Sequence, residues 1–464
     1  MAEVIKPERP GGFLDFLPAD YLAREKMLAT ISGVFRSFGF DPIETPRIEF
    51  LKTLAGEESD TGKNIFRVQG GTDEESLAMP FDHTVPFARI LAGNPYDAKK
   101  RTGIRLPWRR MVVGPVFRTE KPQAGRYRQF YQFDLDIAGV SSMLADAEIV
   151  TMIHHTMAAL GIERFLIRIN NRKILNGLSE VVGLSERKDA DQAALAQEMM
   201  RILDKQDKLG LDEVMRQLAA PPETQWDIKP NLDRAGLEKV KSFLCIGGDN
   251  QAKLQGAREV FAGSQTAMDG IAELKELLSY LAPMGCPESK VAVDFSVARG
   301  LDYYTGPVME TQLLDAPQFG SVFSGGRYNG LVARFTGQEL PATGASIGVD
   351  RLFAALAHLE LLDRKRISSC EVFIMRLLED ANARYLQIAS ELRAAGLNAE
   401  VSLLDDLTFK AQFNYGLGRG ANYIVICGGD EIAKNEVQVR NLATREQVAV
   451  PMEGLKAYFT DLAQ

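Results

Sequence analysis

The stretch RRMVVGPVFRTEKPQAGRYRQFYQFDLDIAG, residues 109–139, organises the rest of the chain. Both of its ends are rich in apolar and aromatic residues and its centre is polar, which predicts two antiparallel strands joined by a long loop. Side chains alternate between the two faces of a strand, so Gln132, Asp134 and Asp136 are expected on one face. Such a polar row indicates a face that binds a ligand, or else an ordinary hairpin with one face in water.

The charge around this stretch is opposite in sign to that of the whole chain. Residues 99–128 contain ten Lys or Arg residues and a single acid, Glu120, whereas the chain as a whole has a formal net charge of -8. A local basic patch favours a polyanion, either a nucleoside triphosphate or a nucleic acid, because guanidinium groups bind phosphate through two hydrogen bonds. A solvated basic face is the alternative.

Length and composition are those of an ordinary globular protein. The chain has 464 residues, of which 45% are hydrophobic and 25% charged, and this predicts two to four domains. No apolar run is long enough to span a bilayer and the first residues do not form a signal peptide, so we expect a cytoplasmic protein without a membrane partner. The four cysteines and four histidines have no ligand spacing, so no metal site is predicted.

The segment FRTEKPQAGRYRQFYQFDLDIAG resembles the second signature motif of class II aminoacyl-tRNA synthetases, in the form found in histidyl-tRNA synthetases. Further regions agree with that family and follow in its order: MPFDHTVPFAR at 79–89, ARGLDYYTGPVME at 298–310 with SGGRYNGLV at 324–332, and GASIGVDRL at 344–352. Within the third region, GGR at 325–327 resembles the glycine-rich turn of the family, and on its own it predicts a hairpin loop.

The resemblance covers nearly the whole chain and implies an enzyme. Its reaction would be the activation of histidine by ATP to histidyl-adenylate, followed by transfer of the acyl group to the 3′ end of histidine tRNA, with release of AMP and pyrophosphate. Magnesium would accompany ATP. The partners implied are therefore histidine, ATP and histidine tRNA.

The domain organisation follows from the resemblance and from composition together. An α+β catalytic domain with an antiparallel sheet of the class II synthetase type would comprise residues 1–169 and 289–363. Between these parts, residues 170–288 are rich in helix formers with apolar residues three and four apart, which predicts a helical insertion domain. Residues 370–464 alternate short apolar strands with helices, which predicts an α/β domain resembling the anticodon-binding domain.

The N-terminal region bears on oligomeric state. Residues 21–38 place apolar side chains at helical spacing, and Pro42 and Pro46 follow in a segment that suits an edge or interface strand. In the family this helix and strand form the first motif, which builds the dimer, so the resemblance implies a homodimer. From the residues alone, a monomer whose sheet edge is capped internally is the alternative.

Six residues are assigned to histidine by resemblance: Asp82, Thr84, Gln132, Asp136, Tyr303 and Tyr304. Asp82 and Thr84 stand where a strand runs into a helix and would bind the α-amino group, although Asp82 at such a position can also simply cap the helix. Asp136 and a tyrosine hydroxyl such as that of Tyr304 would pair with the two imidazole nitrogens, which rejects side chains lacking that pair.

Four residues are assigned to ATP by resemblance: Arg118, Glu120, Arg126 and Arg351. Arg118 would hold both the α-phosphate and the histidine carboxylate. Glu120 would meet the adenine end, Arg126 the outer phosphates, and Arg351, at a helix N-terminus, the γ-phosphate. The catalytic role is assigned to Arg118 and Arg299, because Arg299 would touch the α-phosphate where related enzymes use a magnesium ion.

Two other functions are alternatives. One is a histidine-binding regulatory paralogue of ATP phosphoribosyltransferase, and the other is a tRNA-binding regulator with an inactive core. That paralogue characteristically lacks the anticodon-binding domain and degrades the arginine-bearing signature, and both are intact in this sequence. The presence of Arg118, Arg299 and Arg351 argues against an inactive core.

Overall fold

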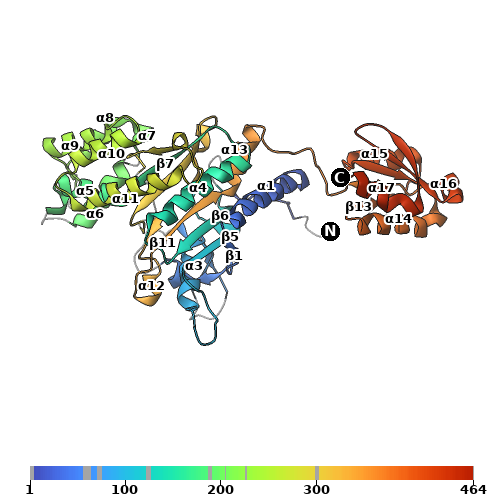
Figure 1. Ribbon diagram of the computed structural model, residues 1–464, viewed down its shortest axis with the longest axis horizontal. Coiled ribbons are helices and arrows are strands. Elements are labelled where there is room, and N and C mark those ends of the chain that lie inside the picture. Colours follow the sequence, from blue (N-terminus) through green and yellow to red (C-terminus); the bar gives the residue numbers. More distant parts are fainter. Residues whose placement is uncertain are drawn as a thin grey trace. The chain divides into compact units, whose positions relative to one another are not determined.

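The structure, a computed structural model, describes residues 5–55, 64–70, 76–121, 127–186, 191–203, 205–224, 227–297 and 303–462. The chain forms two compact units (Figure 1). The first comprises Met1–Leu14 and Ala29–Leu361, and the second Asp15–Leu28 and Leu362–Gln464. Among the described helices, none combines the length and apolar character needed to cross a bilayer.

An eight-stranded sheet forms the centre of the first unit, with the strand order β1-β5-β6-β11-β10-β9-β7-β8. The two strands β5 (Trp108–Phe117) and β6 (Gln129–Ala138) pair antiparallel over their whole lengths. The remaining strands are β1 (Asp41–Pro42), β7 (Phe165–Asn171), β8 (Val291–Val293), β9 (Pro307–Leu313), β10 (Ser321–Tyr328) and β11 (Ala342–Gly348). The hairpin predicted at 109–139 is confirmed.

The pairing is antiparallel through the six central strands, as the predicted fold class requires. At the two edges, β1 pairs parallel with β5 and β8 pairs parallel with β7. The sheet is therefore mixed at its margins, which the prediction of an antiparallel sheet did not include.

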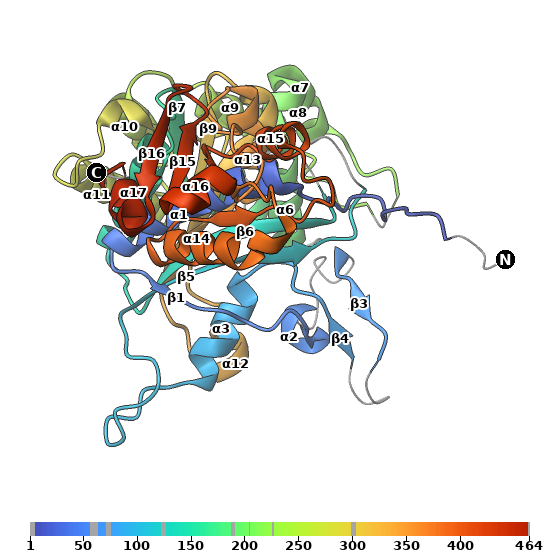
Figure 2. The same ribbon diagram turned by 90° about the vertical axis from the view of Figure 1, so that its right-hand side faces the viewer.

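Alternation along β6 separates the core from a pocket. Phe133 faces the helical layer, where its ring centroid lies 4.8 Å from that of Phe35 in α1 (Pro18–Ser37). The helices α4 (Met143–Ala159) and α13 (Val349–His358) also pack on this layer. Opposite, α3 (Thr84–Gly93) and α12 (Ala333–Thr336) lie on the other side of β5 and β6, as Figure 2 shows.

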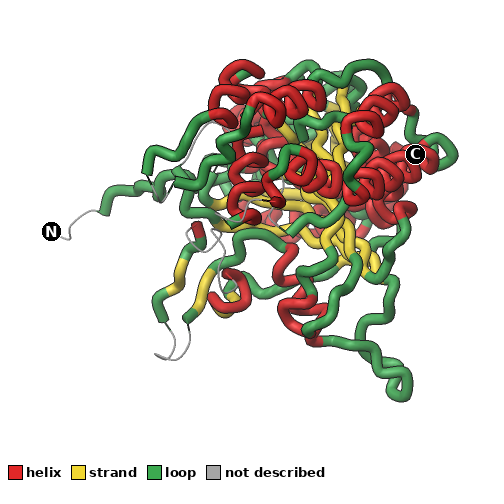
Figure 3. Tube along the Cα trace, turned by 90° about the vertical axis from the view of Figure 1, so that its left-hand side faces the viewer, coloured by secondary structure: helices red, strands yellow, loops and turns green. Residues whose placement is uncertain are grey.

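Smaller elements complete that second side. A three-stranded sheet has the order β2-β4-β3, formed by β2 (Glu49–Phe50), β3 (Arg67–Val68) and β4 (Leu77–Ala78), and it adjoins α2 (Leu51–Ala55). Between α3 and β5 the chain makes an excursion held by bridges from Pro95 to Ile104 and from Asp97 to Thr102. Figures 2 and 3 show this loop reaching away from the sheet.

The segment between β7 and β8 is helical. It contains α5 (Arg172–Val181), α6 (Gln192–Leu203), α7 (Gln206–Leu209), α8 (Leu211–Ala219), α9 (Arg234–Leu244), α10 (Asn250–Val260) and α11 (Gln265–Leu281). A Cβ on Gly177 would lie 2.5 Å from the Ala267 Cβ, so α5 and α11 approach closely only because glycine is present. α11 also contacts α4, and the helices belong to the same compact unit as the sheet.

The second unit contains a five-stranded sheet in the order β13-β12-β14-β15-β16. Its strands are β12 (Val372–Ile374), β13 (Ala399–Val401), β14 (Tyr423–Ile426), β15 (Glu436–Asn441) and β16 (Gln447–Pro451). Its helices are α14 (Asn382–Ala394), α15 (Phe409–Gly418), α16 (Gly429–Lys434) and α17 (Leu455–Leu462). β12 is parallel to both neighbours, and the last strands are antiparallel, so the predicted α/β pattern is confirmed.

The glycine-rich segment at 325–327 corrects one prediction, because it lies inside β10 and not in a hairpin loop. A Cβ on Gly325 would lie 2.2 Å from the carbonyl oxygen of Gly344 on β11. A Cβ on Gly326 would lie 2.7 Å from the carbonyl oxygen of Pro307 on β9. Glycine is therefore required for the close approach of three central strands, a use that local sequence does not distinguish from a turn.

A buried ion pair between Arg327 and Asp146 joins β10 to the first turn of α4. The Arg327 Nε donates to Asp146 Oδ2 at 3.0 Å, and its Nη1 donates to the Val140 carbonyl oxygen at 2.8 Å. The hydroxyl of Thr343 on β11 donates to Asp146 Oδ1 at 2.8 Å. Because Asp146 is fully buried and accepts from two strands, it fixes the helix against the sheet.

We expect Asp146→Ala to lower the free energy of unfolding of the first unit by about 3–5 kcal/mol, because it leaves the Arg327 charge buried without its partner. Asp315→Ala is the control, since it removes a pair with Arg164 whose side chains are 47% and 68% exposed, and should cost about 1 kcal/mol or less. Urea unfolding followed by tryptophan fluorescence reports on this unit, whose strand β5 begins with Trp108. Equal losses for the two variants would contradict the expectation.

Candidate active site

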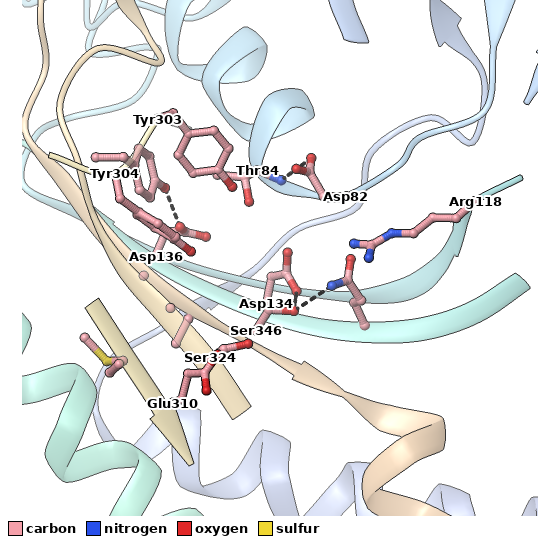
Figure 4. A pocket seen from close by; sticks show the side chains of 16 residues that line it. Asp82, Thr84, Arg118, Asp134, Asp136, Tyr303, Tyr304, Glu310, Ser324 and Ser346 are labelled. Atoms are coloured by element: carbon pink, nitrogen blue, oxygen red, sulfur yellow. Dashed lines mark hydrogen bonds between the residues drawn. The ribbon is translucent and has the colours of Figure 1, made fainter. Parts of the chain in front are cut away.

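A cavity of about 280 Å³ opens on the polar face of β6, close to the lower end of the range for small-molecule sites, about 300–1,000 Å³. Seven of the residues selected from sequence line it: Asp82, Thr84, Arg118, Gln132, Asp136, Tyr303 and Tyr304. Figure 4 shows Arg118 entering from one end and Tyr303, Tyr304 and Asp136 grouped at the other, with Asp82 and Thr84 between them. The polar row on β6 therefore faces a pocket.

Among the described residues, Glu120 and Arg351 were also selected from sequence, and neither lines this cavity. Glu120 is exposed, and the Nη1 of Arg351 donates to the Ser321 carbonyl oxygen at 2.6 Å. Arg126 and Arg299 lie outside the residues that the structure describes. Their assignment to ATP and to catalysis stays a prediction.

The middle of the pocket is formed by the turn that precedes α3. Asp82 Oδ1 accepts hydrogen bonds from the backbone N–H groups of Thr84 and Val85, both at 3.1 Å. The carboxylate therefore caps the helix, as one interpretation of the sequence proposed, and it lines the pocket as well. These two roles are compatible because a carboxylate offers about four acceptor positions.

One end of the pocket is built around Asp136. Its Oδ1 accepts from the hydroxyl of Tyr328 on β10, and its Oδ2 lies 2.5 Å from Nη2 of Arg110, whose side chain is 0% exposed. Burial raises the pKa of Asp136 to about 6, although Arg110 and the Tyr328 hydroxyl both act to lower it. Asp136 is therefore a buried carboxylate that depends on a neighbouring cation to stay ionised.

Asp134 is a second buried carboxylate, two residues before Asp136 on the same face of β6. It accepts from the hydroxyl of Ser346, which in turn accepts from Nε2 of Gln132 at 3.0 Å. Burial raises the pKa of Asp134 to about 6 as well. Together with Asp82, these carboxylates give the inner pocket an acidic character that suits a cationic or N–H-rich ligand.

At the other end, Arg118 is held between aromatic rings. Its guanidinium carbon lies 4.0 Å from the centre of the Phe81 ring and 5.1 Å from that of Phe130. Its Nε donates to the Phe81 carbonyl oxygen at 3.4 Å. This leaves the flat cation directed into the pocket, where it can meet a carboxylate or phosphate.

The basic run at 99–128 does not form the single patch that its sequence suggested. Arg110 is buried against Asp136, and Arg109 points to the opposite face of the sheet, where Nη2 lies 2.8 Å from Glu148. Arg118 lines the pocket, whereas Lys99 and Lys100 are exposed on the excursion after α3. Neighbouring residues on a strand face opposite ways, so a run of like charges spreads over different environments.

Sequence reasoning assigned no individual role to several residues that line the pocket: Asp134, Met309, Glu310, Ser324, Tyr328 and Ser346. The period-two pattern of β6 did signal Asp134, which shares a face with Asp136. The others come from β9, β10 and β11, and only the pairing of those strands brings them to the site. Within the described residues, no group of three or more His, Cys, Asp or Glu side chains is arranged to hold a metal ion.

Comparisons with known proteins agree over nearly the whole chain. The family profile described as Histidyl-tRNA synthetase matches residues 12–352, and that of an Anticodon binding domain matches 371–462. The histidine–tRNA ligase of Paracoccus denitrificans is 40% identical, with 96% of this chain and 92% of the relative covered. That of Rhodopirellula baltica is 38% identical, with 96% and 95% covered.

Solved structures give the same result for the fold. The crystal structure of histidyl-tRNA synthetase from Nostoc sp. matches with a TM-score of 0.81 at 30% identity, covering 98% of this chain and 99% of that chain. An ATP phosphoribosyltransferase regulatory subunit/histidyl-tRNA synthetase from Bacillus halodurans matches with a TM-score of 0.69 at 21% identity, covering 89% and 97%. The second match concerns the fold alone.

The raised pKa of Asp134 predicts a pH-dependent gain in stability for Asp134→Asn. A carboxyl whose pKa is about 6 when folded, against 3.8 when unfolded, costs folding free energy as pH rises through that window, and the cost is complete above it. Between about pH 4.5 and pH 7.5 the stability of the variant relative to the native chain should therefore rise by about 2 kcal/mol.

Urea unfolding at the two pH values measures this difference. Asparagine retains an oxygen that can accept from Ser346, so the hydrogen bond is kept while the ionisation is removed. A stability difference between the two proteins that does not change with pH would show that burial does not raise the pKa of Asp134.

Proposed function

The chain belongs to the histidyl-tRNA synthetase family, and from that premise we propose how its pocket carries out the reaction of the family. That reaction is the ATP-dependent activation of histidine to histidyl-adenylate and transfer of the acyl group to histidine tRNA, so the protein is a ligase of the aminoacyl-tRNA synthetase type. The observation that carries the residue assignments is the polar row of β6, which faces an acidic pocket closed at one end by Arg118.

Histidine lies along the pocket with its three functional groups matched to three regions. Asp82 and Thr84 bind the α-ammonium group, since a carboxylate beside a hydroxyl suits a primary ammonium ion. Asp136 accepts from the imidazole N–H at the far end, where Tyr303 and Tyr304 cover the ring. Arg118 meets the α-carboxylate at the opposite end, so the acidic and basic ends of the cavity set one orientation of the ligand.

Recognition of the ring rests on burial. Asp136 is 3% exposed, its Oδ1 accepts from Tyr328, and its Oδ2 forms an ion pair with Arg110. Among the described residues Oδ2 has no hydrogen-bond partner, so acceptor capacity is available to the ligand. A side chain without a ring N–H would leave this capacity unsatisfied in a buried site, and such sites reject ligands that lack the hydrogen bond strongly. Selectivity for histidine over apolar amino acids follows.

Activation is a matter of placing the histidine carboxylate in line with the α-phosphorus of ATP. Arg118 holds the carboxylate and the α-phosphate together, and positioning of this kind can lower a barrier by roughly 7–11 kcal/mol without covalent catalysis. Arg299 is proposed to stabilise the charge that develops on the α-phosphate, with Glu120, Arg126 and Arg351 contacting other parts of ATP. Magnesium is proposed to arrive with ATP, since it commonly binds through substrate phosphates.

The second unit is proposed to bind the anticodon arm of the tRNA. Phe409 and Phe413 stack with ring centroids 5.8 Å apart, and the Arg440 guanidinium lies 5.4 Å from the Phe413 ring. Phe409 is 50% exposed, so it offers an aromatic face for an unpaired base, as is common in recognition of single-stranded RNA. The regulatory paralogue without such a domain is a less suitable description of this chain, whose match to the anticodon-binding family spans 371–462.

A homodimer in the cytoplasm completes the proposal. β1 lies at the edge of the large sheet, and farther along the chain the apolar side chains of Ile48 and Phe50 are 46% and 42% exposed. A sheet edge and exposed apolar side chains both suit an interface between two copies of the chain. The domain limits proposed from sequence, with a helical insertion at 170–288 and an anticodon-binding domain at 370–464, are retained as part of this proposal.

We expect the purified protein to catalyse histidine-dependent exchange between pyrophosphate and ATP, and to charge histidine tRNA. Measuring exchange with each of the other amino acids provides the control for specificity. Exchange that depends on histidine but no charging would locate a failure in the tRNA step. A protein that binds histidine and performs neither reaction would support the regulatory alternative and overturn the proposal.

A further inference from the structure

Arg110 is a fully buried arginine that is not among the residues lining the pocket. It lies on β5 directly opposite Asp136 of β6, and its Nη2 is 2.5 Å from Asp136 Oδ2. The same nitrogen donates to the His83 carbonyl oxygen at 3.1 Å. Its guanidinium carbon lies 4.5 Å from the centre of the Phe87 ring, so the cation rests on α3 as well.

These contacts connect two regions of the pocket that are far apart in the sequence, the turn before α3 and the end formed by Asp136. His83 stands between Asp82 and Thr84, at the turn that lines the middle of the pocket, and Asp136 lies at the end. We propose that Arg110 is a positioning residue that sets the distance between the ammonium and imidazole regions of the histidine site and keeps Asp136 ionised. This inference rests on the proposed function and extends it to a residue that does not touch the substrate.

The positive charge of Arg110 acts on the pKa of Asp136 in the opposite direction to the nearby carboxylates. The other titratable groups that face Asp136 are Tyr328 from β10, Asp134 from β6, Asp82 from the turn before α3, and Tyr303 and Tyr304 from the segment before β9. Both carboxylates raise the pKa of Asp136 and Arg110 lowers it. His83 adds no charge near neutral pH, because burial lowers its pKa to about 4.

The bonding of Arg110 favours this role over that of a structural anchor. Its Nε and Nη1 have no hydrogen-bond partner among the described residues, so its polar interactions are concentrated on Asp136 and the His83 carbonyl. Buried ion pairs add little net stability compared with apolar side chains of similar volume. Since apolar side chains could replace the pair without loss of stability, a pair beneath the pocket is better explained by its effect on the ligand.

The test measures the KM of histidine and of ATP separately by pyrophosphate exchange, across a range of pH, for Arg110→Met and Arg110→Lys. In Arg110→Met the histidine KM should rise on the order of 10- to 100-fold, because a carboxylate that has become neutral no longer accepts a charged hydrogen bond. The ATP KM should stay within about twofold. Arg109→Met is the matched control, since Arg109 faces the other side of the sheet and pairs with Glu148.

The pH profile separates positioning from general damage to the fold. Loss of the cation raises the pKa of Asp136, so the acid limb of kcat/KM for histidine should move to higher pH in Arg110→Met and return towards its native position in Arg110→Lys. The imidazole of the substrate titrates in the same range with every variant, near 6.5, so the shift is taken relative to the native protein. An unmoved acid limb would overturn the proposal.

A double-mutant cycle with Asp136→Asn completes the test and applies even where Arg110→Met alone does not fold, since the double variant leaves no uncompensated charge. If Arg110 acts through Asp136, adding Arg110→Met to Asp136→Asn should change the histidine KM by less than about threefold. A further large increase, or equal increases for histidine and ATP, would overturn the inference. A native protein without histidine-dependent exchange would overturn the proposed function itself, whereas native exchange with an unaffected Arg110→Met overturns this inference alone.

Discussion

Burying a carboxylate beneath a ligand pocket requires a compensating charge, and in this chain Arg110 provides it for Asp136. An isolated ionised carboxylate away from water would take up a proton, and it would then no longer be a strong acceptor. The two side chains are brought together by the register of β5 and β6, in which their backbones lie directly opposite each other. The register of the hairpin therefore also determines the charge of the pocket.

The strands β10 and β11 also accommodate the ion pair between Arg110 and Asp136. A Cβ on Gly344 of β11 would lie 2.1 Å from Asp136 Oδ1, so the strand beside β6 has to carry glycine where the carboxylate leans over it. From the other side of β11, Tyr328 of β10 supplies a hydroxyl to the same oxygen. The opposite face of β6 is apolar and packs on the helical layer through contacts such as Phe133 with Phe35. A rigid sheet thus presents a polar site on one face while its other face forms the core.

The fold and part of the site follow from local pattern, because both depend on periodicity. The alternation of β6 identified the face that holds Gln132, Asp134 and Asp136, and the helical spacing of the segment between β7 and β8 identified its helices. The resemblance to the family motifs supplied the proposed roles of Asp82 and Arg118. Pattern alone leaves Asp82 ambiguous between a helix cap and a ligand-binding residue.

What could not be predicted depends on contacts between distant segments. Arg110 counted as one basic residue among ten, and only strand pairing shows that it is buried against Asp136. The local sequence around Gly325 predicts a turn, and only its contact with β11 shows that it lies inside a strand. The grouping of Asp15–Leu28 with the second unit is likewise a tertiary property that no local signal records.

The central claim is that a buried, ionised Asp136 accepts a hydrogen bond from the imidazole ring of histidine. Calorimetric titration of the protein with histidine and with its two forms methylated on one or the other ring nitrogen tests it directly. A methyl group on the nitrogen that faces Asp136 removes the donor and leaves the carboxylate unpaired, so at least one of the two forms should bind about 100-fold more weakly or worse. Binding of both methylated forms as tightly as histidine would contradict the account.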